Sequence, residues 1–170
     1  MKSIETSSIP AGRDVAIIGS IKAATIFDPV AYKRLSIRLA RIDRQAAPHW
    51  GKMSVNQMLN HLKVATGSGL QNYQLADESS WLNRQVIKRI AIYLLPRLPQ
   101  NAAAPVGFSV EANVEHSFAA EQTSVRKVLH DAYLSLRSYF PHPLFGNMNR
   151  ADWGRLVYRH IDHHLRQFGY

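Results

Sequence analysis

The C-terminal stretch decides the fold, and it reads Trp153-Gly154-Arg155-Leu156-Val157-Tyr158-Arg159-His160-Ile161-Asp162-His163-His164-Leu165-Arg166-Gln167-Phe168-Gly169-Tyr170. Spacings of three and four residues place one set of side chains on a single helical face: Trp153, Val157, His160, His164 and Phe168. His160 and His164 lie about 40° apart around such a helix, so both imidazoles can reach one metal ion. The stretch therefore predicts an amphipathic helix whose inward face carries two potential metal ligands.

Two earlier segments also have the periodicity and start signals of helices. Asp28 can cap the first helix and Pro29 suits its first position, so we expect a helix from there to about Arg44. Ser54 and Gln57 have the spacing of a capping box. They predict a second helix that ends near the glycines at 67 and 69.

The middle of the chain adds two more helices. Residues 81–95 form an amphipathic pattern whose apolar side we expect to cover the core or a ligand pocket, with a membrane surface as the alternative. A long loop should cover 96–115, and Ser117 should cap a helix that runs to about 140. Asn149 and Asp152 should start the C-terminal helix. With no convincing strand and no repeat, the predicted fold is all-α.

Composition limits the chemistry. The chain has 170 residues and no cysteine, so any metal must be held by nitrogen and oxygen ligands, and disulfides or cysteine nucleophiles are excluded. The net charge of +9 fits either a binding surface for anions, nucleic acid or membranes, or a basic surface without a specific partner. The spread of the positive charges along the chain favours the second interpretation.

The chain is expected to form one domain with an N-terminal extension. Residues 1–26 are interpreted as a loosely attached arm and 27–170 as the helical domain. No apolar run approaches the roughly 20 residues that span a bilayer, and the N-terminus lacks the features of a signal peptide. We therefore expect a cytoplasmic protein.

His61 is the candidate third metal ligand. It lies on the apolar face of the second predicted helix, whereas His49, His116 and His142 fall in connectors and are interpreted as structural or solvated. A buried imidazole needs a partner, and a lone one is usually a hydrogen-bonded core residue. Three buried imidazoles would need several acceptors at once, which a metal ion replaces, although such histidine pairs also occur by chance. The sequence therefore allows two interpretations of His61, His160 and His164: they bind a metal ion together, or they are ordinary buried histidines.

Such a site would have catalytic rather than structural character. Three neutral imidazoles leave a coordination position open, and zinc or nickel suits them. Trp153, His163 and Gln167 are expected to flank the ligands, and Gln57 is either a second-shell residue or only the end of the capping box. A zinc peptidase is disfavoured because no glutamate lies beside the histidines to act as a general base.

Two segments resemble the motifs of a known family. Trp50-Gly51-Lys52-Met53-Ser54 with Gln57-Met58-Leu59-Asn60-His61, and His142-Pro143-Leu144-Phe145-Gly146 with Trp153-Gly154 and Tyr158 to Gly169, resemble the DUF1569 family within the DinB/YfiT-like superfamily. The resemblance covers about 27–170. It implies a four-helix bundle with up-down-down-up topology, and a zinc or nickel site formed by His61, His160 and His164.

The resemblance also implies a class of activity without fixing it. Characterised relatives in that superfamily include thiol-dependent S-transferases and a mycothiol-dependent isomerase, so a transferase that uses a metal-activated, anionic small thiol is the first expectation, with a hydrolase as a variant. A non-catalytic stress-related protein that binds metal, nucleic acid or a protein partner is the second. A homodimeric scaffold that uses 81–95 as its partner surface is the third.

Overall fold

The structure is a computed structural model that describes residues 24–70, 75–101, 117–135 and 139–170. It is all-α in these residues, as predicted, and contains no strand there, only an isolated antiparallel bridge between His142 and Gly146. The helices are α1 (Pro29–Arg41), α2 (Val55–Ser68), α3 (Phe118–Leu134) and α4 (Arg150–Gln167). A further helical segment contains two π-helical stretches, η1 (Asn83–Ile87) and η2 (Ile90–Leu94). None of the described helices is long and apolar enough to cross a membrane.

The predicted starts of all four α-helices are confirmed. Asp28 accepts a hydrogen bond from the Ala31 N–H at the start of α1, and Ser117 caps α3 in the same manner. The Ser54–Gln57 capping box begins α2, and a second capping box formed by Asn149 and Asp152 begins α4. Side-chain oxygens thus satisfy backbone N–H groups that have no partner within the helix.

Two helix ends were predicted too late. Helix α1 ends at Arg41 rather than near Arg44, where the amide of Gln122 from α3 donates to the Leu39 carbonyl at 2.9 Å. Helix α3 ends at Leu134 rather than near 140, and the Tyr139 hydroxyl returns to donate to the Ala132 carbonyl at 2.6 Å. In both cases a side chain from outside the helix binds a carbonyl of the last turn: Gln122 comes from α3, and Tyr139 from the segment that follows α3.

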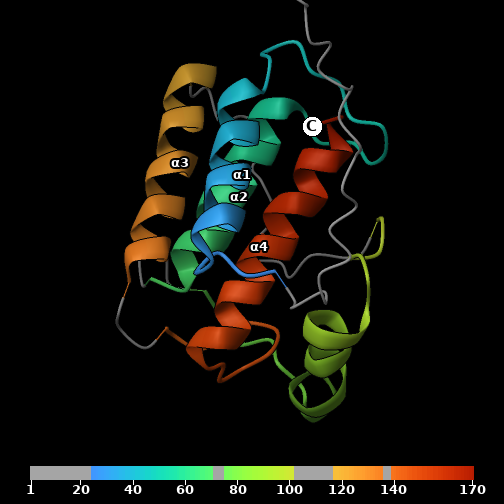
Figure 1. Cartoon of the computed structure of the whole chain (residues 1–170). Helices are drawn as coiled ribbons and strands as arrows, with labels where there is room; N and C mark the ends of the chain where they lie inside the picture. Colours follow the sequence, from blue (N-terminus) through green and yellow to red (C-terminus); the bar gives the residue numbers. More distant parts are fainter. Residues whose placement is uncertain (1–23, 71–74, 102–116, 136–138) are drawn as a thin grey trace, which may run out of the picture.

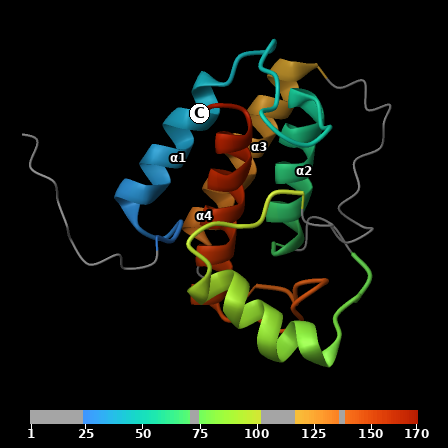
Figure 2. The same cartoon turned by 90° about the vertical axis from the view of Figure 1, so that its right-hand side faces the viewer.

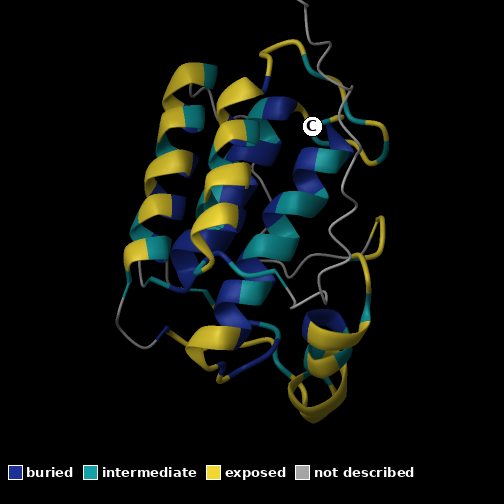
Figure 3. Ribbon diagram, viewed as in Figure 1, coloured by how far each residue is buried: buried dark blue, intermediate teal, exposed yellow. Residues whose placement is uncertain are grey.

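The four α-helices pack side by side around one core (Figure 1). Both α1 and α4 run in one direction, and α2 and α3 run in the opposite direction, as the colours from blue to red show (Figure 1). Helix α2 packs most extensively on α3, while α4 contacts α1 and α2. The buried faces point toward this shared interior, and the exposed faces of α1 and α3 point outward (Figure 3). Fully buried side chains in it include Leu35, Leu62, Leu129, Ile161 and Leu165.

Helix α4 is fixed at both ends by contacts with distant residues. Near its start, the Ile26 N–H donates to the Gly154 carbonyl at 3.1 Å. A Cβ on Gly154 would lie 2.4 Å from a ring carbon of Phe27, so only glycine allows this close approach. Farther along, Arg38 of α1 binds Asp162 at 2.6 Å. These contacts hold the histidine-bearing part of α4 against the bundle.

The segment 81–94 differs from its prediction in both geometry and burial. It crosses near the beginning of α4 instead of running alongside the bundle (Figure 2). Hydrogen bonds from the Lys88 N–H to the Asn83 carbonyl and from the Leu95 N–H to the Ile90 carbonyl span five residues, which makes wide π turns. The expected cover of the core holds for Ala91 and Ile92, which are buried in the core, whereas Leu82 and Leu94 from the same predicted stripe are exposed.

Most of the predicted loop at 96–115 and most of the predicted arm at 1–26 lie outside the described residues. Residues 24–26 are described, and Ile26 is fully buried in the core rather than loosely attached. His116 also lies outside the described residues.

Candidate metal centre

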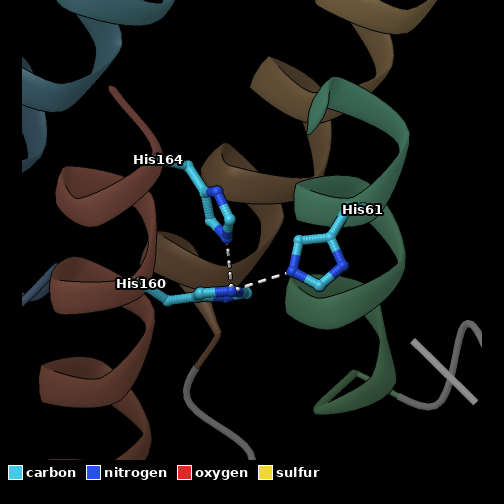
Figure 4. Close-up of side chains that lie close together, drawn as sticks. All are labelled: His61, His160 and His164. Carbon is cyan, nitrogen blue, oxygen red and sulfur yellow. Dashed lines mark hydrogen bonds between the residues drawn. The ribbon is translucent and has the colours of Figure 1, made fainter. Parts of the chain in front are cut away.

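His61, His160 and His164 meet between α2 and α4, as Figure 4 shows. Nε2 of His160 lies 3.0 Å from Nε2 of His61 and 3.1 Å from Nε2 of His164. One nitrogen from each of the three rings lies within 4.8 Å of the other two. Nitrogens bound to one tetrahedral zinc ion at its usual bond length lie about 3.3 Å apart, so small side-chain shifts suffice for the three rings to share an ion. The structure thus brings together the three residues selected from the sequence.

Hydrogen bonding alone does not satisfy this cluster. An imidazole Nε2 holds either one proton or one lone pair in the plane of the ring. Nε2 of His160 therefore cannot make two well-aligned hydrogen bonds at once, to His61 and to His164. A divalent cation is able to accept one lone pair from each ring, so the donor set fits a metal better than it fits a hydrogen-bonded core.

Gln167 fixes which nitrogen of His164 is available. Its Nε2 donates to the Trp50 carbonyl at 2.7 Å, so its Oε1 must face Nδ1 of His164, also at 2.7 Å. Because Oε1 only accepts, Nδ1 of His164 carries the proton and donates it. The lone pair then lies on Nε2, which faces His160. This is the arrangement that second-shell partners impose on histidine ligands in metal sites.

The same hydrogen bonds join the site to the loop before α2. Gly51 in this loop has φ of +78°, a conformation that favours glycine. A Cβ at Gly51 would also lie 2.7 Å from Nε2 of Gln167. The loop can therefore approach Gln167 closely only with glycine at this position.

Burial keeps the imidazoles neutral, which metal binding requires. It lowers the pKa of His164 to about 3, with the proximity of His61 adding to the effect. It also lowers the pKa of His160 well below its ordinary value, helped by His164 and His61. Burial likewise lowers the pKa of His163, followed by the nearby charge of Arg166.

The triad lies on a cavity of about 450 Å³, within the size range of small-molecule sites. The lining residues come from α2, α4, the segment 81–94, the residues 95–101 that follow it, and the loops at 50–53 and 142–145. Among the described residues of the lining, none is Asp or Glu, and most are apolar. A ligand in this cavity would therefore contact apolar side chains and the face of the histidine cluster.

The predicted flanking residues divide between the cavity and the helix start. Trp153, His163 and Gln167 line the cavity. Gln57 does not: its Oε1 accepts from the Ser54 N–H at 2.8 Å, so the capping-box interpretation is the correct one. It is therefore corrected from a candidate pocket residue to a helix cap.

Lys52 and His142 are among the lining residues that sequence reasoning did not assign to the site. His142 is buried, stacks on Phe145 with ring centroids 4.8 Å apart, and accepts from the Leu144 and Phe145 N–H groups through Nδ1. Its structural interpretation is confirmed, but its place on the cavity was not expected. The Trp50-Gly51-Lys52 motif was the available signal for Lys52.

Fold and site together define an all-α protein with a candidate three-histidine metal centre beside a largely apolar cavity. Residues 31–169 match the model of a family described as a protein of unknown function, DUF1569, and the chain belongs to this family. Comparisons with curated proteins and with solved structures found no match.

Proposed function

We propose that the protein is a divalent-metal-dependent enzyme of the DinB/YfiT-like superfamily, which transfers a low-molecular-weight thiol to an electrophile. The observation that carries this proposal is the convergence of His61, His160 and His164 through Nε2 on one side of a cavity. The opposite directions of the helix pairs α1/α4 and α2/α3 support the proposed up-down-down-up bundle (Figure 1).

Zinc or nickel is the proposed ion. Three neutral imidazoles suit either metal and leave a position for a substrate, as in catalytic sites. When bound, the cation would supply a Lewis acid that lowers the pKa of a thiol. Gln167 would hold His164 in the ligating tautomer, and the buried surroundings of His160 would keep that imidazole neutral.

The cavity supplies binding and orientation for the two reactants. Lys52 would attract an anionic thiol, of which bacillithiol and glutathione are examples. The apolar lining would exclude water from the electrophile. In the balanced reaction a C–S bond forms, the proton of the thiol is released to solvent, and the leaving group departs with the bonding electron pair.

Metal binding is the first test. We expect the purified chain to bind one equivalent of zinc or nickel in a calorimetric titration. His160→Ala should weaken this binding by more than the roughly 10- to 100-fold typical of an outer-shell partner. His130→Ala is the matched control, because His130 is exposed and contacts Tyr32 on the outside of the bundle. Absence of stoichiometric binding in the wild type, with no effect of His160→Ala, would overturn the proposal.

The second test measures catalysis. The metal-loaded chain, mixed with glutathione or bacillithiol and a chlorodinitrobenzene, should form the thioether faster than the uncatalysed mixture. His160→Ala should lose this acceleration, whereas His130→Ala should keep it. A chain that binds metal and shows no acceleration with either thiol would contradict the transferase assignment while leaving the metal centre intact.

A further inference from the structure

The polarity of the cavity lining changes along α4. The lining residues from the beginning of the helix are Trp153, Leu156 and Val157, and those from its end are His160, His163, His164 and Gln167. At 1.5 Å per residue, the helix carries this change from Trp153 to Gln167 over about 21 Å. The α4 side of the cavity is therefore apolar at one end and polar at the other, and the apolar ring of Trp50 also lies at the polar end, 5.6 Å from the ring of His163.

Other elements strengthen the same division. At the apolar end, His142 lies against both Phe145 and Trp153, with ring centroids 4.8 and 5.4 Å away. Helix α2 runs opposite to α4 (Figure 1), and its lining residues are His61 and, farther along the helix, Ala65 and Thr66. The two helices thus present their imidazoles at the same end of the cavity.

The segment 81–94 closes the apolar end. Ile87, Ile90 and Ala91 line the cavity, and the η2 part of the segment lies beside the first half of α4. Tyr93 binds Asp152 there, and Arg159 donates to the Ile92 carbonyl at 3.1 Å. These contacts place an apolar wall opposite Trp153 and Leu156 rather than opposite Gln167.

A positively charged side chain, that of Lys52, lines the cavity at its polar end. Among the described lining residues, Lys52 is the one Lys or Arg side chain, and it forms no ion pair with a described residue. It follows Gly51, which lies against Gln167. An anionic group entering this end would meet Lys52 without a competing lining carboxylate.

We propose that the substrate bound beside the thiol is an anionic amphiphile: an apolar chain or ring system lies at the Trp153 end, and its charged group lies at the Lys52 end. This inference rests on the proposed function for its chemistry, since it places the polar part of the electrophile at the histidines. The binding itself needs only the apolar wall and Lys52.

The ligand test uses calorimetry on the full chain, freed of metal by a chelator, with three probes. Decanoate should bind with one-to-one stoichiometry. Butanoate, with the same head group and a shorter chain, should bind at least about 100-fold more weakly, because each buried methylene contributes roughly fourfold. Decyltrimethylammonium, with the same chain and opposite charge, should also bind more weakly. Equal binding of decanoate and butanoate, or no binding of decanoate, would overturn the inference.

Matched variants locate the binding. Ile90→Gln should weaken decanoate binding at least about tenfold, because it places an amide on the apolar wall. Leu82→Gln, on the same segment but exposed and outside the lining, should leave it unchanged. Lys52→Gln should weaken it by about two- to fivefold, as expected for an exposed charge pair, and Lys33→Gln on α1 should not. Equal losses for Ile90→Gln and Leu82→Gln would show that decanoate binds the outer surface, and would refute the cavity as its site.

A parallel zinc titration separates the two hypotheses. Decanoate binding that survives in His160→Ala while zinc binding is lost is the expected result. Zinc binding without decanoate binding would refute the amphiphile and leave the metal centre standing. Decanoate binding in a chain that never binds zinc would refute the proposed enzyme and keep the ligand class.

Discussion

The cavity has two walls of opposite character. The histidine wall consists of the lining residues of α2 and α4, and it belongs to a bundle whose interior includes Leu62 and Ile161 with no exposed surface. The outer wall consists of the segment 81–94, on which Trp81 and Leu94 are 73% and 71% exposed. Both walls are helical, but in the outer wall only Ala91 and Ile92 are buried.

Polar contacts hold the outer wall together with the packing of Ala91 and Ile92 into the core. Lys88 donates to the Asn147 carbonyl at 3.0 Å, and Tyr93 donates to Asp152. The residues proposed to position a metal ion therefore lie on the densely packed wall. The outer wall, which is proposed to face the apolar part of the ligand, is the more exposed of the two, as elements beside binding sites often are.

The largest expected effect compares truncations on the two walls. Trp153→Ala should lower the free energy of unfolding by about 3–5 kcal/mol, because a fully packed aromatic side chain is lost along with its hydrogen bond to the Phe140 carbonyl. Leu94→Ala should change it by no more than about 0.5 kcal/mol. Urea unfolding monitored by circular dichroism measures both. Similar losses for the two variants would show that the outer wall belongs to the core.

Acid should lower the free energy of unfolding through His142, at the Trp153 end of the cavity. Burial lowers the pKa of His142 to about 4, so the folded chain keeps this ring neutral while the unfolded chain takes up a proton below about 6.5. The stabilisation is therefore complete above pH 6.5 and is lost as the pH falls to about 4, at a cost of about 3 kcal/mol. His142→Asn, which keeps an acceptor for the loop N–H groups, should show a correspondingly smaller loss. Identical pH profiles for variant and wild type would contradict a neutral, buried His142.

The next effect concerns the metal ligands. Gln167→Leu should weaken zinc binding about 10- to 100-fold, because His164 loses the acceptor that fixes its tautomer. Gln85→Leu makes the same substitution at an exposed position of the outer wall and should leave the affinity unchanged. Calorimetric titrations of both variants provide the comparison. An unchanged affinity in Gln167→Leu would remove the role assigned to the Trp50–Gln167–His164 chain of hydrogen bonds.

The smallest expected effect is on the local stability of the outer wall. Tyr93→Phe should cost about 1 kcal/mol and should speed amide exchange in 81–95 more than in α4. The hydrogen bond to Asp152 raises the pKa of Tyr93, so this contact stabilises the folded chain below pH 10 and weakens as the pH rises above it. Alkali should therefore increase exchange in this segment first. Uniform exchange along the chain in Tyr93→Phe would show that the two walls open together.

Sequence alone predicted the histidine wall better than the outer wall. The starts of α2 and α4 followed from capping residues, and His61, His160 and His164 followed from their places on apolar faces. These are local signals, and the bundle preserves them because its helices keep ordinary α-helical spacing. The tautomer of His164 could not be predicted, because it depends on the Trp50 carbonyl, far away in the sequence.

The predicted apolar stripe of the outer wall matched only in part, because the segment does not have the geometry of a regular α-helix. Ile87, Ile90 and Ala91 line the cavity as expected, but Leu82 and Leu94 from the same predicted stripe are exposed. A stripe calculated for 3.6 residues per turn goes out of phase in the wider π turns. Nothing in the local composition marked the two five-residue hydrogen bonds that cause this.

Those wide turns have a consequence for how this segment tolerates changes in length. Each π turn spans one residue more than an α turn, so deletion of Gln85 within η1 would allow the helix to regain α geometry without breaking the chain. In a regular α-helix such a deletion would rotate the following residues by about 100°, but here the conversion of the π turn into an α turn takes up the lost residue and the following residues keep their faces. A one-residue deletion here would leave both the later cavity-facing side chains and the histidine wall in place, so the segment tolerates a change in length that a regular α-helix would not.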